Sequence, residues 1–223
     1  MNDILKNVAN NMLELGLGAL THANRHAAYQ DPVNDKWGEL SVLQAAHAAE
    51  ILIKARIAQE HPLLIFDKFP KILNTKISLQ DLFEDGRTIE WSELPNRLWA
   101  TTGERLDNVC LFNKFGKIRN GIQHFGDVPD QISPSLETLK FIYGVIDPFI
   151  NKCWGYYAID FDEDLDPYIY FLQTLISYEI KFLVSEEAAK YSNDWSDYLQ
   201  NASIEYRCLM EKRIRKALEE KTI

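Results

Sequence analysis

The stretch SVLQAAHAAEILIKARIAQE, residues 41–60, decides the fold class of this chain. It contains neither glycine nor proline, and its apolar side chains recur at helical spacing. His61 and Pro62 close the pattern. We therefore predict a long helix that opens at Ser41 or slightly earlier. Its predicted apolar face consists of Leu43, Ala46, Ile53 and Ile57, with Val42 and Ala49 beside them.

The composition extends this prediction to the whole chain. Glycine (10) and proline (8) together make up 18 of 223 residues, about 8%, against a usual total of about 12%. A chain with so few turn-forming residues has few turns and long elements, which favours an all-α fold. The further helices are predicted over residues 2–29, from Thr101 or Thr102 to Gly126, and from Pro134, capped by Ser133 and kinked at Pro148.

Two segments fall outside these four helices. Residues 62–102 contain three internal prolines and a glycine, and we interpret them as an insertion with short helices or turns. Residues 158–223 begin with an acidic run and continue as two apolar and amphipathic segments. They predict a C-terminal helical pair, the second helix running from about Asp194 to Glu220, packed against a domain of residues 1–157.

The net charge and the cysteine content exclude several classes of protein. Lys and Arg (24) against Asp and Glu (33) give a net charge of −9, which excludes a general polyanion binder. The three cysteines form no close pair and do not predict a disulfide framework. The first residues lack a basic region typical of a signal peptide, and no apolar run approaches the length of a membrane span. We expect a cytoplasmic protein without a membrane partner.

The segment KFGKIRNGIQHFG, residues 114–126, carries the candidate chemistry. On a helix, Asn120 and His124 share a face, and Arg119 lies on its flank. We expect Gly121 and Gly126 to loosen or end the helix, so that these three side chains converge. Two lysines, Lys114 and Lys117, make this the most basic short stretch in the middle of the chain, and we predict that they bind substrate.

This segment resembles the signature of the HEPN family of helical nucleases and nucleic-acid-handling proteins. That signature is an Arg, often followed by a polar residue, and a His a few positions later near a helix end. The stretch AAHAAEILIKARIAQEHP before it is also HEPN-like. The resemblance covers residues 1–157 and implies an up-and-down four-helix bundle. It also implies a homodimer in which two motifs meet.

The chemistry suits these residue types. Metal-independent RNA cleavage uses the 2′-OH as an internal nucleophile, with a base that removes its proton and an acid that protonates the leaving 5′-oxygen. Imidazole can do either near neutral pH, so His124 is the predicted acid or base. Arg119 presents a cationic fork to the phosphorane, and Asn120 positions the reacting groups. DNA, which lacks the 2′-OH, is not an expected substrate.

The resemblance implies an endoribonuclease without metal or other cofactor that acts as a toxin or an antiviral-defence effector. Its implied partners are RNA, a second copy of the chain, and an antitoxin or nucleotidyltransferase. The alternatives are a non-catalytic HEPN-like module that binds nucleotides or protein, and a structural helical adaptor. The two motif residues also have a purely structural interpretation, in which Arg119 is an ion-pair or surface residue and His124 a helix C-terminal cap.

Two further groups of residues have open interpretations. His47, Glu50 and Lys54 lie within one sector of the predicted second helix, as a second shell around the catalytic motif or as a polar stripe at the edge of the core. His22 and His26 are four residues apart on the first helix and would suit a shared metal. No Cys pair or third His has a spacing that would complete such a site, so we predict none.

Overall fold

The structure, a computed structural model, describes residues 5–70, 78–163 and 167–219. It is predominantly helical and confirms the predicted all-α class. The strands β1 (Phe66–Lys68) and β2 (Arg87–Thr88) form a short antiparallel pair. Within the described ranges, no helix combines the length and apolar character needed to cross a membrane.

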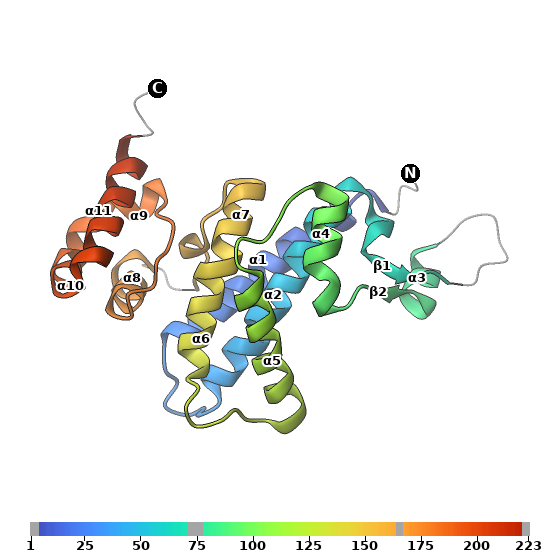
Figure 1. The fold of residues 1–223 in the computed structure, drawn as a ribbon, viewed down its shortest axis with the longest axis horizontal. Coiled ribbons are helices and arrows are strands. Elements are labelled where there is room, and N and C mark those ends of the chain that lie inside the picture. Colours follow the sequence, from blue (N-terminus) through green and yellow to red (C-terminus); the bar gives the residue numbers. More distant parts are fainter. Residues whose placement is uncertain (1–4, 71–77, 164–166, 220–223) are drawn as a thin grey trace.

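The helix predicted over residues 41–60 is the centre of the molecule. It forms α2 (Trp37–Glu60), which begins four residues before Ser41 and buries thirteen of its 24 residues. Its extensive burial follows from neighbours on several sides, because α2 contacts α1 (Val8–Ala28), α4 (Leu94–Thr102), α5 (Val109–Phe125) and α6 (Pro134–Phe141). Figure 1 shows α1 and α2 crossing the middle of the fold. Apolar side chains of α2 therefore supply much of the core.

Two further helical segments complete the bundle. The first is α5 (Val109–Phe125), and the second joins α6 (Pro134–Phe141) to α7 (Asp147–Trp154) through the π-helical turn Ile142–Ile146. The predicted cap is confirmed, since the Ser133 hydroxyl accepts a hydrogen bond from the Leu136 backbone N–H. The disturbance predicted at Pro148 is the π-helical turn just before it, because proline has no N–H to continue the α-helical pattern.

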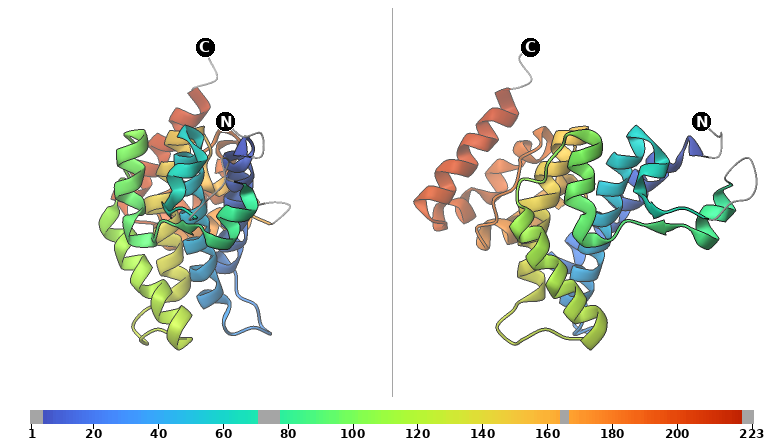
Figure 2. Two further views of the ribbon diagram at one scale, coloured as in Figure 1. Left: turned by 90° about the vertical axis from the view of Figure 1, so that its right-hand side faces the viewer. Right: turned by 45° about the vertical axis from the view of Figure 1, so that its right-hand side comes forward.

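Residues 62–102 contain the predicted short helices and also the strand pair, which was not predicted. The helices are α3 (Leu79–Asp85) and α4 (Leu94–Thr102), with 3₁₀ turns at Pro62–Ile65 and Trp91–Glu93. Figure 2 shows β1, β2 and α3 extending away from the bundle, whereas α4 lies against it.

The helix predicted from Thr101 or Thr102 begins later, at Val109. Both threonines instead end α4, where their hydroxyls donate to carbonyls of the preceding turn. Gly103 then adopts φ 76°, and the Asn108 side chain caps α5 by accepting from the Leu111 N–H.

The prediction of a C-terminal helical pair is wrong. The segment is divided into α8 (Pro167–Ser177), α9 (Glu186–Lys190), α10 (Ser196–Asn201) and α11 (Ile204–Glu219). The long helix expected from Asp194 breaks at Ser203, whose N–H and hydroxyl both donate to the Glu179 carboxylate at 2.7 Å. The Ser203 hydroxyl also caps α11 by accepting from the Tyr206 N–H at 3.4 Å, so a local cap and a residue distant in sequence together mark the start of this helix.

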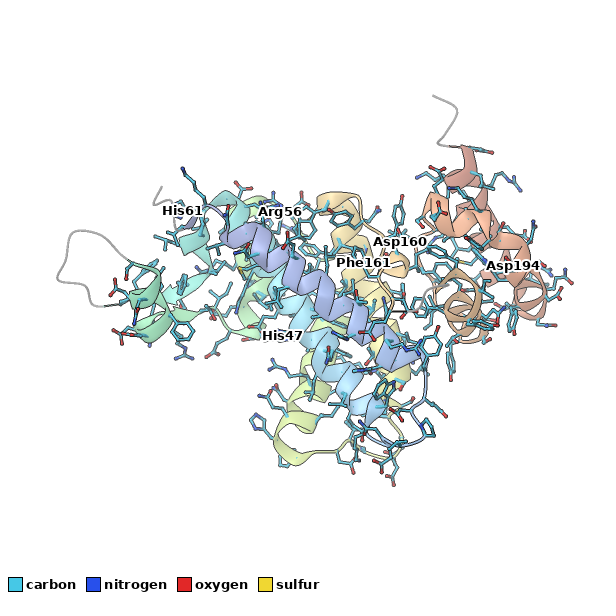
Figure 3. All side chains as sticks on the ribbon, turned by 180° about the vertical axis from the view of Figure 1, so that it is seen from behind. His47, Arg56, His61, Asp160, Phe161 and Asp194 are labelled. Carbon is cyan, nitrogen blue, oxygen red and sulfur yellow. The ribbon has the colours of Figure 1, made fainter. Side chains whose placement is uncertain are left out.

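A buried polar network joins the bundle to these C-terminal helices. The Asp147 carboxylate accepts 2.8 Å hydrogen bonds from the backbone N–H groups of Ala158 and Leu183. Asn24 of α1 donates to the carbonyls of Ala158 and Phe161 at 2.9 and 2.7 Å. Asp160 and Phe161 mark this region in Figure 3. We call this network, centred on Asp147 and Asn24, the junction.

Candidate functional site

The C-terminal half of α5 holds the candidate motif, and its backbone is regular. Phe112, Phe115, Ile118 and Ile122 anchor one side of the helix in the core. The helix continues through Gly121 and ends at Gly126, which adopts φ 73° and donates its N–H to the Ile122 carbonyl at 2.9 Å. The expected loosening at Gly121 is therefore absent from this described helix.

An unbroken helix separates the three motif side chains. Five residues of helix rotate Arg119 and His124 about 140° apart. Arg119 is half-buried and turned toward α2, while Asn120 and His124 are exposed. The expected convergence of all three at one helix end does not occur within a chain.

Arg119 is held by two contacts that fix the plane of its guanidinium. Nη1 donates to the Gln123 side-chain oxygen at 3.1 Å, one helical turn later. The guanidinium carbon lies 5.2 Å from the centre of the Trp91 ring. Among the described residues, its buried Nε has no hydrogen-bond partner. Nη1 of Arg119 therefore donates to Gln123, whereas Nε of the same guanidinium donates to no protein group among the described residues.

Trp91 comes from the irregular segment 62–102 and packs closely against α5. Its indole stacks on Phe112 with ring centres 4.1 Å apart. A Cβ at Gly116 would lie only 2.4 Å from the indole Nε1, so this contact requires glycine. Trp91 thereby supports Arg119. Gln123 has a sequence signal, because it follows Arg119 by four residues, but nothing in the sequence places Trp91 beside them.

A pocket of about 290 Å³ opens between α2 and α5 beside Arg119. We call it the Arg119 pocket. Its lining residues are Leu43, Ala46, His47 and Glu50 from α2, with Arg119 and Gln123 from α5. His47 lies partway along α2, as labelled in Figure 3, and is exposed. Of the three residues predicted to surround the catalytic motif, His47 and Glu50 therefore line the same pocket as Arg119.

Lys54, the third of these residues, is not among those that line the pocket, but it contacts Glu50, which is. Its buried ammonium pairs with the Glu50 carboxylate at 2.6 Å and donates to the Thr88 hydroxyl of β2 at 3.1 Å. This ion pair offsets the charge of Glu50 and fixes its position. Because Glu50 is compensated, the charge that Arg119 adds to the pocket favours an anion.

The two predicted substrate lysines have different surroundings. Lys114 pairs with Glu137 of α6 at 2.6 Å, and Lys140 pairs with the same carboxylate at 3.0 Å. Burial opposes the ionisation of Glu137, but these hydrogen bonds outweigh it and lower its pKa. Lys114 is therefore engaged with α6, whereas Lys117 is exposed on α5.

Lys117 belongs to a row of exposed polar side chains along α5. Asn113, Lys117, Asn120 and His124 are all exposed, and their spacing places them within about 60° of one another around the helix. We call this row the α5 stripe. It lies on a different face of α5 from the Arg119 pocket, so one chain presents the two halves of the motif separately.

His22 and His26 lie on α1 with ring centres 6.2 Å apart. His22 contacts the Glu163 carboxylate through Nδ1, and His26 packs on Trp37 with ring centres 3.9 Å apart. Across the described ranges, no group of three or more His, Cys, Asp or Glu side chains could hold a metal ion.

Comparison of the chain with protein-family models, curated proteins and solved structures gives no significant match.

Proposed function

We propose that this protein is a metal-independent endoribonuclease with a HEPN-type helical bundle, active as a homodimer. One observation supports this most directly: α5 presents Asn120 and His124 on an open face while Arg119 is fixed in an adjoining pocket. These are the residue types that RNA transesterification requires, an imidazole for proton transfer and a guanidinium for the charged phosphorane.

The separation of Arg119 from His124 favours a site shared between two chains. Both groups must reach one phosphate, yet they point about 140° apart on a single helix. A two-fold contact that places the α5 stripe of each chain against the Arg119 pocket of the other would bring the partner's His124 to Arg119. It would also gather Lys117 and Arg119 of both chains, which gives a chain of net charge −9 a local cationic surface for RNA.

The experiment is cleavage of a random-sequence single-stranded RNA pool in excess chelator. We expect 2′,3′-cyclic phosphate ends and no cleavage of a DNA pool, because DNA lacks the internal nucleophile. Arg119→Ala and His124→Ala should each lose at least about a thousandfold in rate, and Asn120→Ala ten- to a hundredfold. Cleavage that requires a divalent metal, or that also degrades DNA, would contradict the mechanism. RNA bound but left intact would instead support the non-catalytic nucleotide-binding module.

The dimer is tested at the assay concentration by sedimentation equilibrium. The proposal requires a mass twice that of the chain whenever cleavage is measured, and a fully active monomer would contradict it. A role as a toxin or antiviral-defence effector follows only from the HEPN resemblance. Expression of wild type and His124→Ala in growing cells tests it, with growth arrest expected for wild type alone. An antitoxin or nucleotidyltransferase is the corresponding proposed partner.

A further inference from the structure

The Arg119 pocket contains an imidazole that the R-x4-H motif does not include. His47 stands on α2, far from the motif in sequence, yet it lines the same pocket as Arg119. It is exposed, so a substrate can reach it. His124, in contrast, lies on the α5 stripe, outside the residues that line this pocket.

The surroundings of His47 are suited to proton transfer. Glu50 follows His47 by three residues on α2 and shares its face. The Glu50 carboxylate is fixed by its 2.6 Å ion pair with Lys54, which is in turn bonded to Thr88. An immobilised carboxylate beside an imidazole can accept its N–H and so set the orientation of the ring.

We propose that His47 is a catalytic residue and forms one half-site with Arg119, while the partner's His124 and Asn120 form the other. This proposal rests on the endoribonuclease function proposed above. It solves a requirement of the reaction, since cleavage needs a base and an acid together and the motif supplies a single imidazole per chain. The dimer then contains two equivalent composite sites, each made of one Arg119 pocket and one α5 stripe.

The bond changes balance with these groups alone. One imidazole removes the proton of the 2′-OH, and the 2′-oxygen forms a bond to phosphorus. The bond between phosphorus and the 5′-oxygen breaks, and the other imidazole, initially protonated, delivers its proton to that oxygen. Arg119 stabilises the added negative charge on the phosphorane. One imidazole has gained a proton and the other has lost one, and exchange with water restores both.

Complementation between inactive variants tests this division into half-sites. Each pair of variants is co-expressed with two different affinity tags, and the heterodimer is purified through both. In the heterodimer of a His47→Ala chain and a His124→Ala chain, the first chain keeps its α5 stripe and the second keeps its Arg119 pocket. These two intact half-sites together form one complete composite site, whereas the other composite site lacks both imidazoles. About half of the wild-type rate is therefore expected, and Arg119→Ala paired with His124→Ala gives the same result. His47→Ala paired with Arg119→Ala leaves both pockets damaged, so no activity returns.

A pH profile separates a catalytic from a structural role of His47. Wild type should give a bell-shaped dependence of rate on pH, and the residual rates of His47→Ala and His124→Ala should each lack a different limb. His61→Asn is the matched control, because His61 lies at the other end of α2 and Asn can retain its capping hydrogen bond to Leu63. This control should keep the wild-type rate and both limbs.

The outcomes distinguish the two proposals. If wild type does not cleave RNA, the endoribonuclease function itself fails. If wild type cleaves but His47→Ala keeps full activity and both limbs, only the role of His47 is overturned. Recovery of activity in the His47→Ala and Arg119→Ala heterodimer would equally overturn the assignment of both residues to one half-site.

Discussion

The junction and the Arg119 pocket both contain polar side chains, but the hydrogen bonds of these side chains are complete in the junction and incomplete in the pocket. In the junction, both carboxylate oxygens of Asp147 accept backbone N–H groups, and the Asn24 amide is bonded on its nitrogen and its oxygen. In the pocket, Arg119 uses Nη1 for Gln123, its Nε has no partner among the described residues, and His47 is exposed. A satisfied, buried polar group stabilises a fold, whereas an accessible and incompletely satisfied one is available to a ligand.

This difference predicts where a substitution costs stability. The largest effect is expected for Asp147→Ala, which leaves the buried N–H group of Ala158 and the half-buried N–H group of Leu183 without an acceptor. The free energy of unfolding should fall by about 3–4 kcal/mol. Urea denaturation followed by tryptophan fluorescence measures this, with Asp130→Ala as the control because Asp130 is exposed in the loop after α5. Equal stability of the two variants would remove the distinction between junction and surface.

A smaller effect is expected from pH. Burial raises the pKa of Asp147 from 3.8 to about 7, against the opposing effects of its two N–H bonds and of Arg213. The native state then holds a proton that the unfolded state releases, so this carboxyl lowers the free energy of unfolding as pH rises from about 4 to about 7. The slope per group is at most about 1.4 kcal/mol per pH unit.

Asp147→Asn removes this titration but keeps the shape of the side chain. Its urea stability relative to wild type should therefore improve between pH 5 and pH 8, on top of a constant loss from the missing second acceptor. A difference between the two proteins that stays constant over this range would show that Asp147 titrates outside it.

The sequence predicted the positions of the main helices well, but it predicted poorly which side chains meet between them. The glycine-free, proline-free stretch 41–60 predicts the central helix, and Ser133 with Pro134 predicts the start of α6, because both signals are local. The break before α11 was missed although it carries a local signal, because the Ser203 hydroxyl caps the helix by accepting from the Tyr206 N–H. The sequence does not reveal that Ser203 is also held by the Glu179 carboxylate, twenty-four residues earlier. Local capping and periodicity reveal little about partners at such separations.

The candidate site also combines residues that the sequence reveals with a contact that only the tertiary structure shows. The spacing of Arg119, Asn120 and His124 is a local signal, and the structure places all three near the end of one helix. The relative faces were predicted correctly, with Asn120 and His124 together and Arg119 on the flank. The convergence of all three side chains was wrong, because Gly121 was expected to loosen a helix that instead continues to Phe125. Trp91, which stacks on Phe112 and faces Arg119, comes from a segment with no regular pattern. Its contact with α5 arises from tertiary packing alone.

The smallest effects on stability are expected from the motif itself. His124 is exposed, and its removal costs only its interaction with the C-terminal end of α5, a few tenths of a kcal/mol. Arg119→Ala loses one exposed hydrogen bond and the contact with Trp91, about 0.5–1 kcal/mol. Both variants should therefore melt within a few degrees of wild type while losing RNA cleavage. Melting curves and cleavage rates from the same preparations make this comparison, with Asp147→Ala as the destabilised reference. If either motif variant unfolds as readily as that reference, its lost activity reports stability, and the separation between pocket and junction does not hold.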